Sequence, residues 1–324
     1  MMRRFIAVLA LPCVLSTAAA ADTIFVTNEK DNSVTVLDSA TLKVVKTIPT
    51  GKRPRGVAIT PDFKEVLVCA GDDDRLDVID TEKLEVVRSM GTGPDPELLD
   101  IDHKGERVYV ANEDDGYVTV LERATGKVLA EIEVGVEPEG MSVSPDDKLV
   151  AATSEATSMA HIIDTANFEV KANILVDTRP RVSIFTADGK LVWVSAEVGG
   201  TVSIIDASTY KIIKKLRFDI PGVRPELIQP MGIVFSKDGK RAFVAIGRAN
   251  RIAVVDTATY ETTNYILTGQ RPWHMALSPD GKKLYTANGL TNDLTVIDVD
   301  SLKAEKSVPV GRLPWGVVIK PASG

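Results

Sequence analysis

Cysteine is nearly absent from this 324-residue sequence, which contains only two. Cys13 lies near the N-terminus in a segment that we expect to be removed, so that Cys69 alone remains in the mature chain. One cysteine cannot form an intramolecular disulfide, and the sequence also lacks the Cys-x-x-Cys-His motif of covalent haem attachment. Cys69 lies in the apolar run 66–70 and is predicted to be a buried small hydrophobe. The fold must therefore be held together by packing and strand pairing.

Long apolar segments are missing after residue 21. Arg3 and Arg4 precede an apolar stretch at 5–15, and the four alanines at 18–21 offer cleavage sites for a signal peptidase. This pattern predicts a signal peptide at residues 1–21, which is too short for a membrane span of about 20 apolar residues. We therefore expect an exported, periplasmic protein without a membrane span, with one domain at residues 22–324.

Positive charge is scarce relative to negative charge. Without Arg3 and Arg4, 36 basic residues face 45 acidic ones, which gives a net charge of −9. Such a chain repels phosphates unless its bases are concentrated on one face, so a nucleic-acid partner is not expected.

Familiar catalytic motifs are missing as well. The sequence has no Gly-x-Ser-x-Gly and no His-Glu-x-x-His, and its three histidines stand apart from one another. Gly91-Thr92-Gly93 is followed by Pro94 rather than by a helix, which argues against a phosphate-binding loop. The acidic run 72–74 is interpreted as a solvated hairpin, with a contribution to a Ca²⁺ site as the alternative. We expect no catalytic residue, no cofactor and no metal site.

What the sequence does contain is a repeat with two independent markers. An acidic residue ends a β-rich run at Asp38, Asp80, Glu122, Asp164, Asp206, Asp256 and Asp298. A proline marks a second register at Pro54, Pro96, Pro138, Pro180, Pro230, Pro272 and Pro314. Both series advance by 42 residues except for one step of 50, so the chain consists of seven units with one insertion.

Each unit is predicted to contain four short strands, because apolar alternation is interrupted by turn sequences such as Ser278-Pro279-Asp280-Gly281. Four strands in about 40–45 residues indicate an all-β, seven-bladed propeller. The mature chain begins on a second strand and ends on a first strand at 316–320, so the two termini should share one blade and close the ring. Lys, Glu and Arg alternate along the fourth strands, which places those strands at the exposed outer edge.

The first unit contains Phe25-Val26-Thr27-Asn28 and a run at 33–38, followed by Pro54-Arg55-Gly56 and Thr60-Pro61-Asp62. These segments resemble the YVTN β-propeller repeat, and the resemblance covers the whole mature chain. Within that family the chain is most similar to the β-propeller proteins associated with pyrroloquinoline quinone (PQQ)-dependent catabolism. This resemblance implies a periplasmic protein that accompanies quinoprotein alcohol dehydrogenases and their cytochromes. It supplies no catalytic residues.

Charged and aromatic residues gather around the seven prolines. In a propeller, the loop into each first strand opens on the same face as the loop between the second and third strands, so these residues should surround one mouth of the central channel. The candidate ligand- or partner-binding residues are Arg53, Arg55, Glu97, Glu139, Arg181, Arg271, Trp273, His274, Arg312 and Trp315.

Two interpretations of these residues remain open. In the first, they are solvated loop residues, and the tryptophans close the channel. In the second, they form a site in which two groups of arginines and a group of acidic residues face an aromatic corner, which we define as Trp273 and Trp315. Arg and Trp concentrate binding energy at interfaces. A guanidinium binds a carboxylate in a fork and an indole offers a flat face, so the second interpretation predicts an anionic, planar ligand.

Three classes of function are compatible with the sequence. The first is a non-catalytic binding or accessory protein, monomeric, whose partner is a quinoprotein dehydrogenase, its cytochrome or a small anion. The second is a lactonase-type hydrolase that would use His274, Glu97, Glu139 and Arg271. The third is a structural or adhesion module. The missing motifs and the family resemblance favour the first class, although a fold by itself does not define a function.

Overall fold

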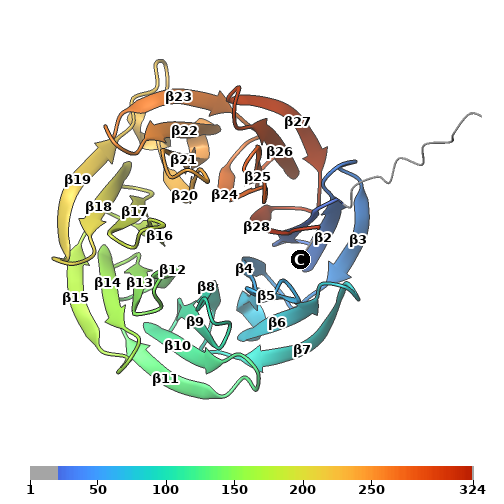
Figure 1. The fold of residues 1–324 in the computed structure, drawn as a ribbon, viewed down its shortest axis with the longest axis vertical. Helices are drawn as coiled ribbons and strands as arrows, with labels where there is room; N and C mark the ends of the chain where they lie inside the picture. The colour runs from blue at the N-terminus through green and yellow to red at the C-terminus, as the bar shows by residue number, and fades with distance from the viewer. Residues whose placement is uncertain (1–20, 323–324) are drawn as a thin grey trace, which may run out of the picture.

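The computed structural model describes residues 21–322, which form seven four-stranded antiparallel sheets arranged as blades around a central channel (Figure 1). The predicted all-β, seven-bladed propeller is thereby confirmed. The predicted signal peptide lies outside the described residues except for Ala21. Within the described range, no helix has the length and apolar character needed to cross a membrane.

In every blade the strands follow one another from the channel outward. From inner to outer strand, the blades are β4 (Pro54–Ile59), β5 (Glu65–Ala70), β6 (Arg75–Asp80) and β7 (Glu85–Gly91); β8 (Pro96–Ile101), β9 (Arg107–Asn112), β10 (Tyr117–Glu122) and β11 (Val128–Glu133); β12 (Pro138–Val143), β13 (Leu149–Ser154), β14 (Met159–Asp164) and β15 (Val170–Leu175); β16 (Pro180–Phe185), β17 (Leu191–Ala196), β18 (Thr201–Asp206) and β19 (Lys211–Arg217); β20 (Pro230–Phe235), β21 (Arg241–Ile246), β22 (Arg251–Asp256) and β23 (Thr262–Leu267); β24 (Pro272–Leu277), β25 (Lys283–Asn288), β26 (Asp293–Asp298) and β27 (Lys303–Pro309); and β28 (Pro314–Lys320), β1 (Thr23–Asn28), β2 (Ser33–Asp38) and β3 (Val44–Pro49). Residues 21–322 also contain three short 3-10 segments, η1 (Gly71–Asp73), η2 (Pro225–Leu227) and η3 (Gly247–Ala249).

The acidic marker of the repeat has a local structural cause. Each of these residues ends a third strand, and its carboxylate accepts hydrogen bonds from the turn that follows. In the first unit, Asp38 Oδ1 accepts the backbone N–H of Thr41 at 2.7 Å. The equivalent Asp206 accepts from Ser208 and Thr209, and these hydrogen bonds lower its pKa to about 2. The carboxylate therefore fixes the tight turn into the outer strand.

The proline marker begins every inner strand, and a bulge follows it directly. In β4 the pairing with β5 jumps from Pro54 to Val57, so that Arg55 and Gly56 together oppose one residue. The other six inner strands show the same shift. The first bulge position is occupied by Arg55, Glu97, Glu139, Arg181, Met231, Trp273 and Trp315. A bulge reorients side chains, and here it does so at six positions that the sequence marks as candidates.

The second bulge position brings neighbouring inner strands into contact. It alternates between glycine and a larger residue around much of the ring, as Gly56, Leu98, Gly140, Val182, Gly232, His274 and Gly316. A Cβ added at Gly140 would lie 2.6 Å from the backbone oxygen of Arg181 in the next blade. Only glycine allows the backbones this close approach.

The core lies between adjacent blades rather than within one of them. Val26 of β1, for example, packs in one cluster with Tyr285 and Leu294 of the preceding blade and with Val317 of β28. The outer strands contribute little to such clusters, because most of their side chains are exposed. Their position confirms the predicted outer edge. Cys69 is fully buried, as predicted.

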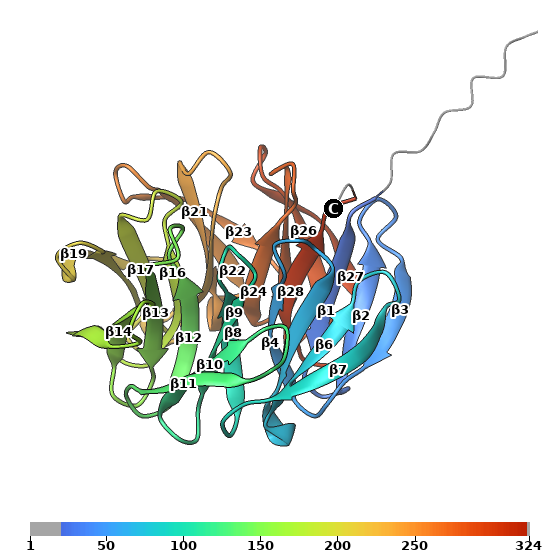
Figure 2. The ribbon, with the colours of Figure 1, turned by 60° about the horizontal axis from the view of Figure 1, so that its bottom comes forward.

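The termini close the ring as predicted. The last strand, β28, pairs antiparallel with β1, so that Thr23 lies opposite Lys320 and Val26 opposite Val317. The shared blade therefore joins the two ends of the chain, and Figure 2 shows the C-terminus beside the N-terminal strands. The strand begins at Pro314, two residues earlier than the sequence pattern indicates.

The inserted segment lies between β19 and β20. Phe218, Ile220 and Ile228 are buried in one cluster with Trp193 of the neighbouring second strand. From its place just before a mouth proline, the insertion at 219–228 is predicted to hang over the mouth with Arg224 and Glu226. The structure does not show this: Arg224 and Glu226 pair with each other at exposed positions, with side chains 74% and 62% accessible. Neither residue lines the mouth.

Candidate functional site

The mouth is organised by a contact that recurs in all seven blades. The residue after each second strand donates its backbone N–H to the residue that precedes the mouth proline, as Glu113 does to Asp95 at 2.8 Å. The seven donors are Glu29, Gly71, Glu113, Glu155, Glu197, Gly247 and Gly289. Six of the seven acceptors have a positive φ of 50–60°, a left-handed conformation that is uncommon for residues other than glycine. The backbone therefore holds the residue before the proline at the mouth in every blade, and in the four blades whose donor is a glutamate it holds a second side chain there.

A cavity of about 470 Å³ lies at this mouth. It is lined by Arg53, Arg55, Asp95, Glu113, Asp114, Arg179, Arg181, Glu197, Arg248, Arg271 and Trp273. The structure thus brings together five of the ten sequence candidates as lining residues. The other five lie beneath the cavity or outside it.

Glu97 lies beneath the cavity with a side chain that is fully inaccessible to solvent. Its Oε1 accepts from Arg53 Nη1 at 2.9 Å and from Arg55 Nη1 at 2.8 Å. Burial alone would raise the pKa of Glu97, but the guanidinium groups of Arg55 and Arg53 outweigh it and lower the pKa. Arg55 also contacts Glu29 at 3.1 Å, and Arg53 contacts Asp72 at 3.0 Å and Asp95.

Arg181 occupies the same position in β16 as Glu97 does in β8, the first position of the bulge. It contacts three acids: Glu139 at 3.1 Å, Glu155, and Glu197 at 3.8 Å. Burial raises the pKa of Glu139 to about 8, because Arg181 compensates only in part and Glu97 adds repulsion. Arg179 binds Glu155 at 2.8 Å and Glu197 at 3.3 Å.

The aromatic corner is divided between the cavity and the channel wall. Trp273 lies under Arg271, whose guanidinium carbon is 4.5 Å from the ring centroid, and it stacks on Trp315 at 6.1 Å. Trp315 is only 1% exposed, and His274 packs on it at 4.1 Å. Burial and the charge of Arg181 lower the pKa of His274 to about 3, so the imidazole is neutral. Trp273 alone offers an indole to a ligand in the cavity.

Arg312 lies apart from the mouth. Its side chain is 69% exposed and pairs with Asp31 at 2.6 Å. The reason is its position, two residues before the proline, whereas Arg53, Arg179 and Arg271 lie one residue before theirs. The equivalent residues Lys52, Val136, Thr178 and Gln270 are exposed as well.

Several residues of the candidate site are not among those predicted from the sequence. Glu29, Glu113, Glu155 and Glu197 occupy the position after the second strand in four blades, at steps of 84, 42 and 42 residues that match the 42-residue spacing of the prolines. That spacing could have revealed them. Arg248 belongs to η3, and no simple sequence signal indicated that it would line the cavity.

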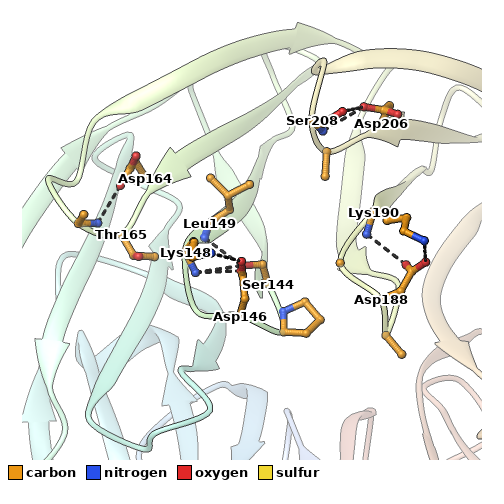
Figure 3. A pocket seen from close by; sticks show the side chains of 15 residues that line it. Ser144, Asp146, Lys148, Leu149, Asp164, Thr165, Asp188, Lys190, Asp206 and Ser208 are labelled. Atoms are coloured by element: carbon orange, nitrogen blue, oxygen red, sulfur yellow. Dashed lines mark hydrogen bonds and ion pairs between the residues drawn. The ribbon is translucent and has the colours of Figure 1, made fainter.

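A larger cavity of about 740 Å³ lies between two blades, among the turns at the opposite ends of the strands (Figure 3). Its charged groups bind partners within their own turns: Asp146 contacts Lys148 at 3.1 Å, and Asp188 contacts Lys190 at 3.2 Å. Asp206 likewise accepts from Ser208. Because these contacts repeat the ordinary turn chemistry of the fold, the mouth is the better candidate site.

The fold and the mouth define the class of protein: a propeller that presents a charged, partly aromatic cavity at one end of its channel. The chain belongs to the choice-of-anchor I domain family, whose model matches residues 112–284, more than half of the sequence. The model of the YNCE-like β-propeller matches residues 5–92. These matches agree with the predicted propeller family and leave the PQQ-associated group as a proposal. No curated protein matches the sequence.

Solved structures share the fold at low sequence identity. Hydrazine synthase from Kuenenia stuttgartiensis superposes with a TM-score of 0.78 at 22% identity, over 90% of this chain and 99% of that one. The periplasmic gluconolactonase of Pseudomonas aeruginosa gives 0.78 at 18% identity, over 94% and 100%. A candidate 6-phosphogluconolactonase from Bacteroides fragilis gives 0.78 at 21%, over 94% and 99%. At such identities the likeness concerns the fold.

Proposed function

We propose that the mouth binds a small organic anion and that the protein acts as a periplasmic binding or accessory propeller. The observation that carries this proposal is an excess of positive charge in one half of the cavity. We call this half the basic sector and define it by Arg179, Arg181, Arg248 and Arg271. A compatible ligand is a carboxylate or phosphate ester attached to a flat or ring-shaped scaffold.

The acids of the basic sector do not neutralise it. Arg179, Arg181 and Arg271 contact Glu139, Glu155 and Glu197, whereas Arg248 contacts none of the three. The four guanidinium groups therefore exceed the three acids by one positive charge even when all three acids are ionised. The raised pKa of Glu139 increases the excess near neutral pH. Burial, together with the charges of Arg248 and Arg181, lowers the pKa of Arg271 despite its contact with Glu197. An anion placed here would relieve this repulsion.

Arg248 and Trp273 offer the directional contacts. Arg248 is exposed and forms no ion pair within the described residues, so its fork of donors is available to a carboxylate. Trp273 is half-buried beside Arg271 and presents a flat apolar surface in the same cavity. The volume of about 470 Å³ lies within the range of about 300–1,000 Å³ typical of small-molecule sites.

The resemblance to PQQ-associated propellers supports a finer version of this proposal. In it, the mouth meets a quinoprotein dehydrogenase, its cytochrome or the anionic quinone cofactor in the periplasm. Lactone hydrolysis is the second candidate, because gluconolactonases share the fold and the same arginines would bind a sugar acid. Of its candidate residues, Glu97 and Glu139 are buried among arginines, and His274 is stacked on Trp315.

Isothermal titration calorimetry with gluconate, 6-phosphogluconate, small dicarboxylates and PQQ tests the proposal. The change Arg248→Ala is expected to weaken binding of the best ligand about 10- to 100-fold, which is the size of one charge-assisted hydrogen bond. Trp273→Ala should weaken it as well. Lys83→Ala, in the turn before β7, and Lys303→Ala, at the start of β27, are matched controls at the outer rim and should not change binding.

Salt dependence and turnover separate the two candidates. Binding by the parent should weaken with salt more steeply than binding by Arg248→Ala, because one exposed charge has been removed. Hydrolysis of δ-gluconolactone above the buffer rate, lost in Arg271→Ala, would favour the hydrolase. If no anion of the panel binds, or if Arg248→Ala binds the best one as tightly as the parent, the proposed basic-sector site is refuted.

A further inference from the structure

The other half of the mouth has the opposite charge. We call it the acidic sector and define it by Asp95, Glu97 and Glu113. One carboxylate oxygen from each of these residues can be chosen so that all three lie within 4.8 Å of one another. We propose that the acidic sector binds a Ca²⁺ ion.

The charge balance leaves room for a cation. The two arginines of this sector, Arg53 and Arg55, contact four carboxylates, those of Glu29, Asp72, Asp95 and Glu97. Glu113 adds a fifth carboxylate beside Glu97, and Asp114 also lines the cavity. Two positive charges therefore face at least five acidic groups, whereas in the basic sector the guanidinium groups outnumber the acidic groups.

A buried oxygen without a partner points to the ligand position. Both arginine contacts of Glu97 go to Oε1. Its Oε2 is buried and receives no hydrogen bond from an N–H or hydroxyl group of the described residues; the one group with which Glu97 can share a proton is the carboxyl group of Glu113. A buried, ionised oxygen is costly to leave unpaired, so a cation beside Glu113 would satisfy it. Glu113 also lies within 4.8 Å of Glu137 and Glu155, which extend the negative surroundings.

The chemistry of the donors selects the metal. All three side chains offer carboxylate oxygens, and neither His nor Cys belongs to the group, so a hard cation is favoured over zinc or copper. Ca²⁺ accepts six to eight oxygens in irregular arrangements, and the open cavity allows water to complete its shell. Mg²⁺ requires a nearly ideal octahedron and should bind more weakly. The backbone hydrogen bond from Glu113 N–H to the carbonyl oxygen of Asp95 holds two of the proposed ligands in place without the metal.

The test is calorimetric titration of EDTA-treated protein with CaCl₂ at pH 7.5, together with the thermal midpoint with and without Ca²⁺. The parent should show saturable binding to one site and a higher midpoint in Ca²⁺ than in EDTA. Glu113→Gln should weaken Ca²⁺ binding at least tenfold while leaving the midpoint in EDTA unchanged or higher, because it removes a repelling charge. Asp114→Asn, at the next residue and outside the group, should change the affinity by no more than about threefold.

Arg248→Ala, which tests anion binding in the basic sector, should leave Ca²⁺ affinity within about threefold of the parent, so the two proposals can fail separately. The Ca²⁺ site is refuted if millimolar CaCl₂ produces neither saturable heat nor a change of midpoint in the parent. It is equally refuted if Glu113→Gln binds Ca²⁺ as tightly as the parent.

Discussion

Removal of the last strand should abolish the fold, because β28 completes the blade that β1 begins. Deletion of residues 315–324 removes Trp315, Val317 and Ile319, which are 1%, 5% and 8% exposed. At about 1.5–3 kcal/mol for each buried side chain, the loss is about 5–9 kcal/mol. The deletion also exposes the ladder edge of β1. Since the total stability of a domain is about 5–15 kcal/mol, the truncated chain should be largely unfolded at 25 °C.

Far-UV circular dichroism and urea denaturation measure this effect. A chain that ends at Lys320 is the control and should match the parent, because it keeps the whole strand. In a second variant, residues 314–320 precede Thr23 through a short turn and are removed from the C-terminus. Since Lys320 lies opposite Thr23, this variant should recover the fold. If the truncated chain melted within a few degrees of the parent, the account of ring closure would be wrong.

Three further predictions concern stability. Arg55→Ala leaves the buried Glu97 with one guanidinium fewer and should lower the free energy of unfolding by about 3 kcal/mol in urea titrations. An unchanged free energy of unfolding would show that the ion pair between Arg55 and Glu97 is dispensable for stability. Burial raises the pKa of Asp100 to about 6, above its ordinary value of 3.8. Ionisation of Asp100 should therefore reduce the free energy of unfolding as the pH rises from 3.8 to 6. In urea titrations, Asp100→Asn should be about 2–3 kcal/mol more stable than the parent at pH 7.5 and should lose this advantage at pH 3.5. Gly140→Ala should lower the thermal midpoint, because its Cβ would meet a neighbouring backbone oxygen at 2.6 Å, whereas Gly91→Ala has nothing within 4 Å and should be neutral.

The sequence determined the architecture because the relevant signals are local and repeated. Turn carboxylates such as Asp38 and mouth prolines such as Pro54 act within a few residues of themselves, so their spacing reports the unit without knowledge of its neighbours. The two end strands then imply closure, since β28 would otherwise lack a blade. Because equivalent positions of all blades lie on the same face of the ring, the repeat also predicted that the residues beside the prolines surround one mouth of the channel.

Tertiary structure decided which of these residues act together, because their partners lie in other blades. Arg53 and Glu97 are 44 residues apart, and Arg271 and Glu197 are 74 apart; nothing local pairs them. A bulge after each proline, and a left-handed residue before six of the seven, set the direction of the side chains. This geometry placed Trp315 in the channel wall and Arg53 in the cavity. Arg312 missed the mouth by a single register position, and only the folded ring separated the excess of arginine from the excess of carboxylate.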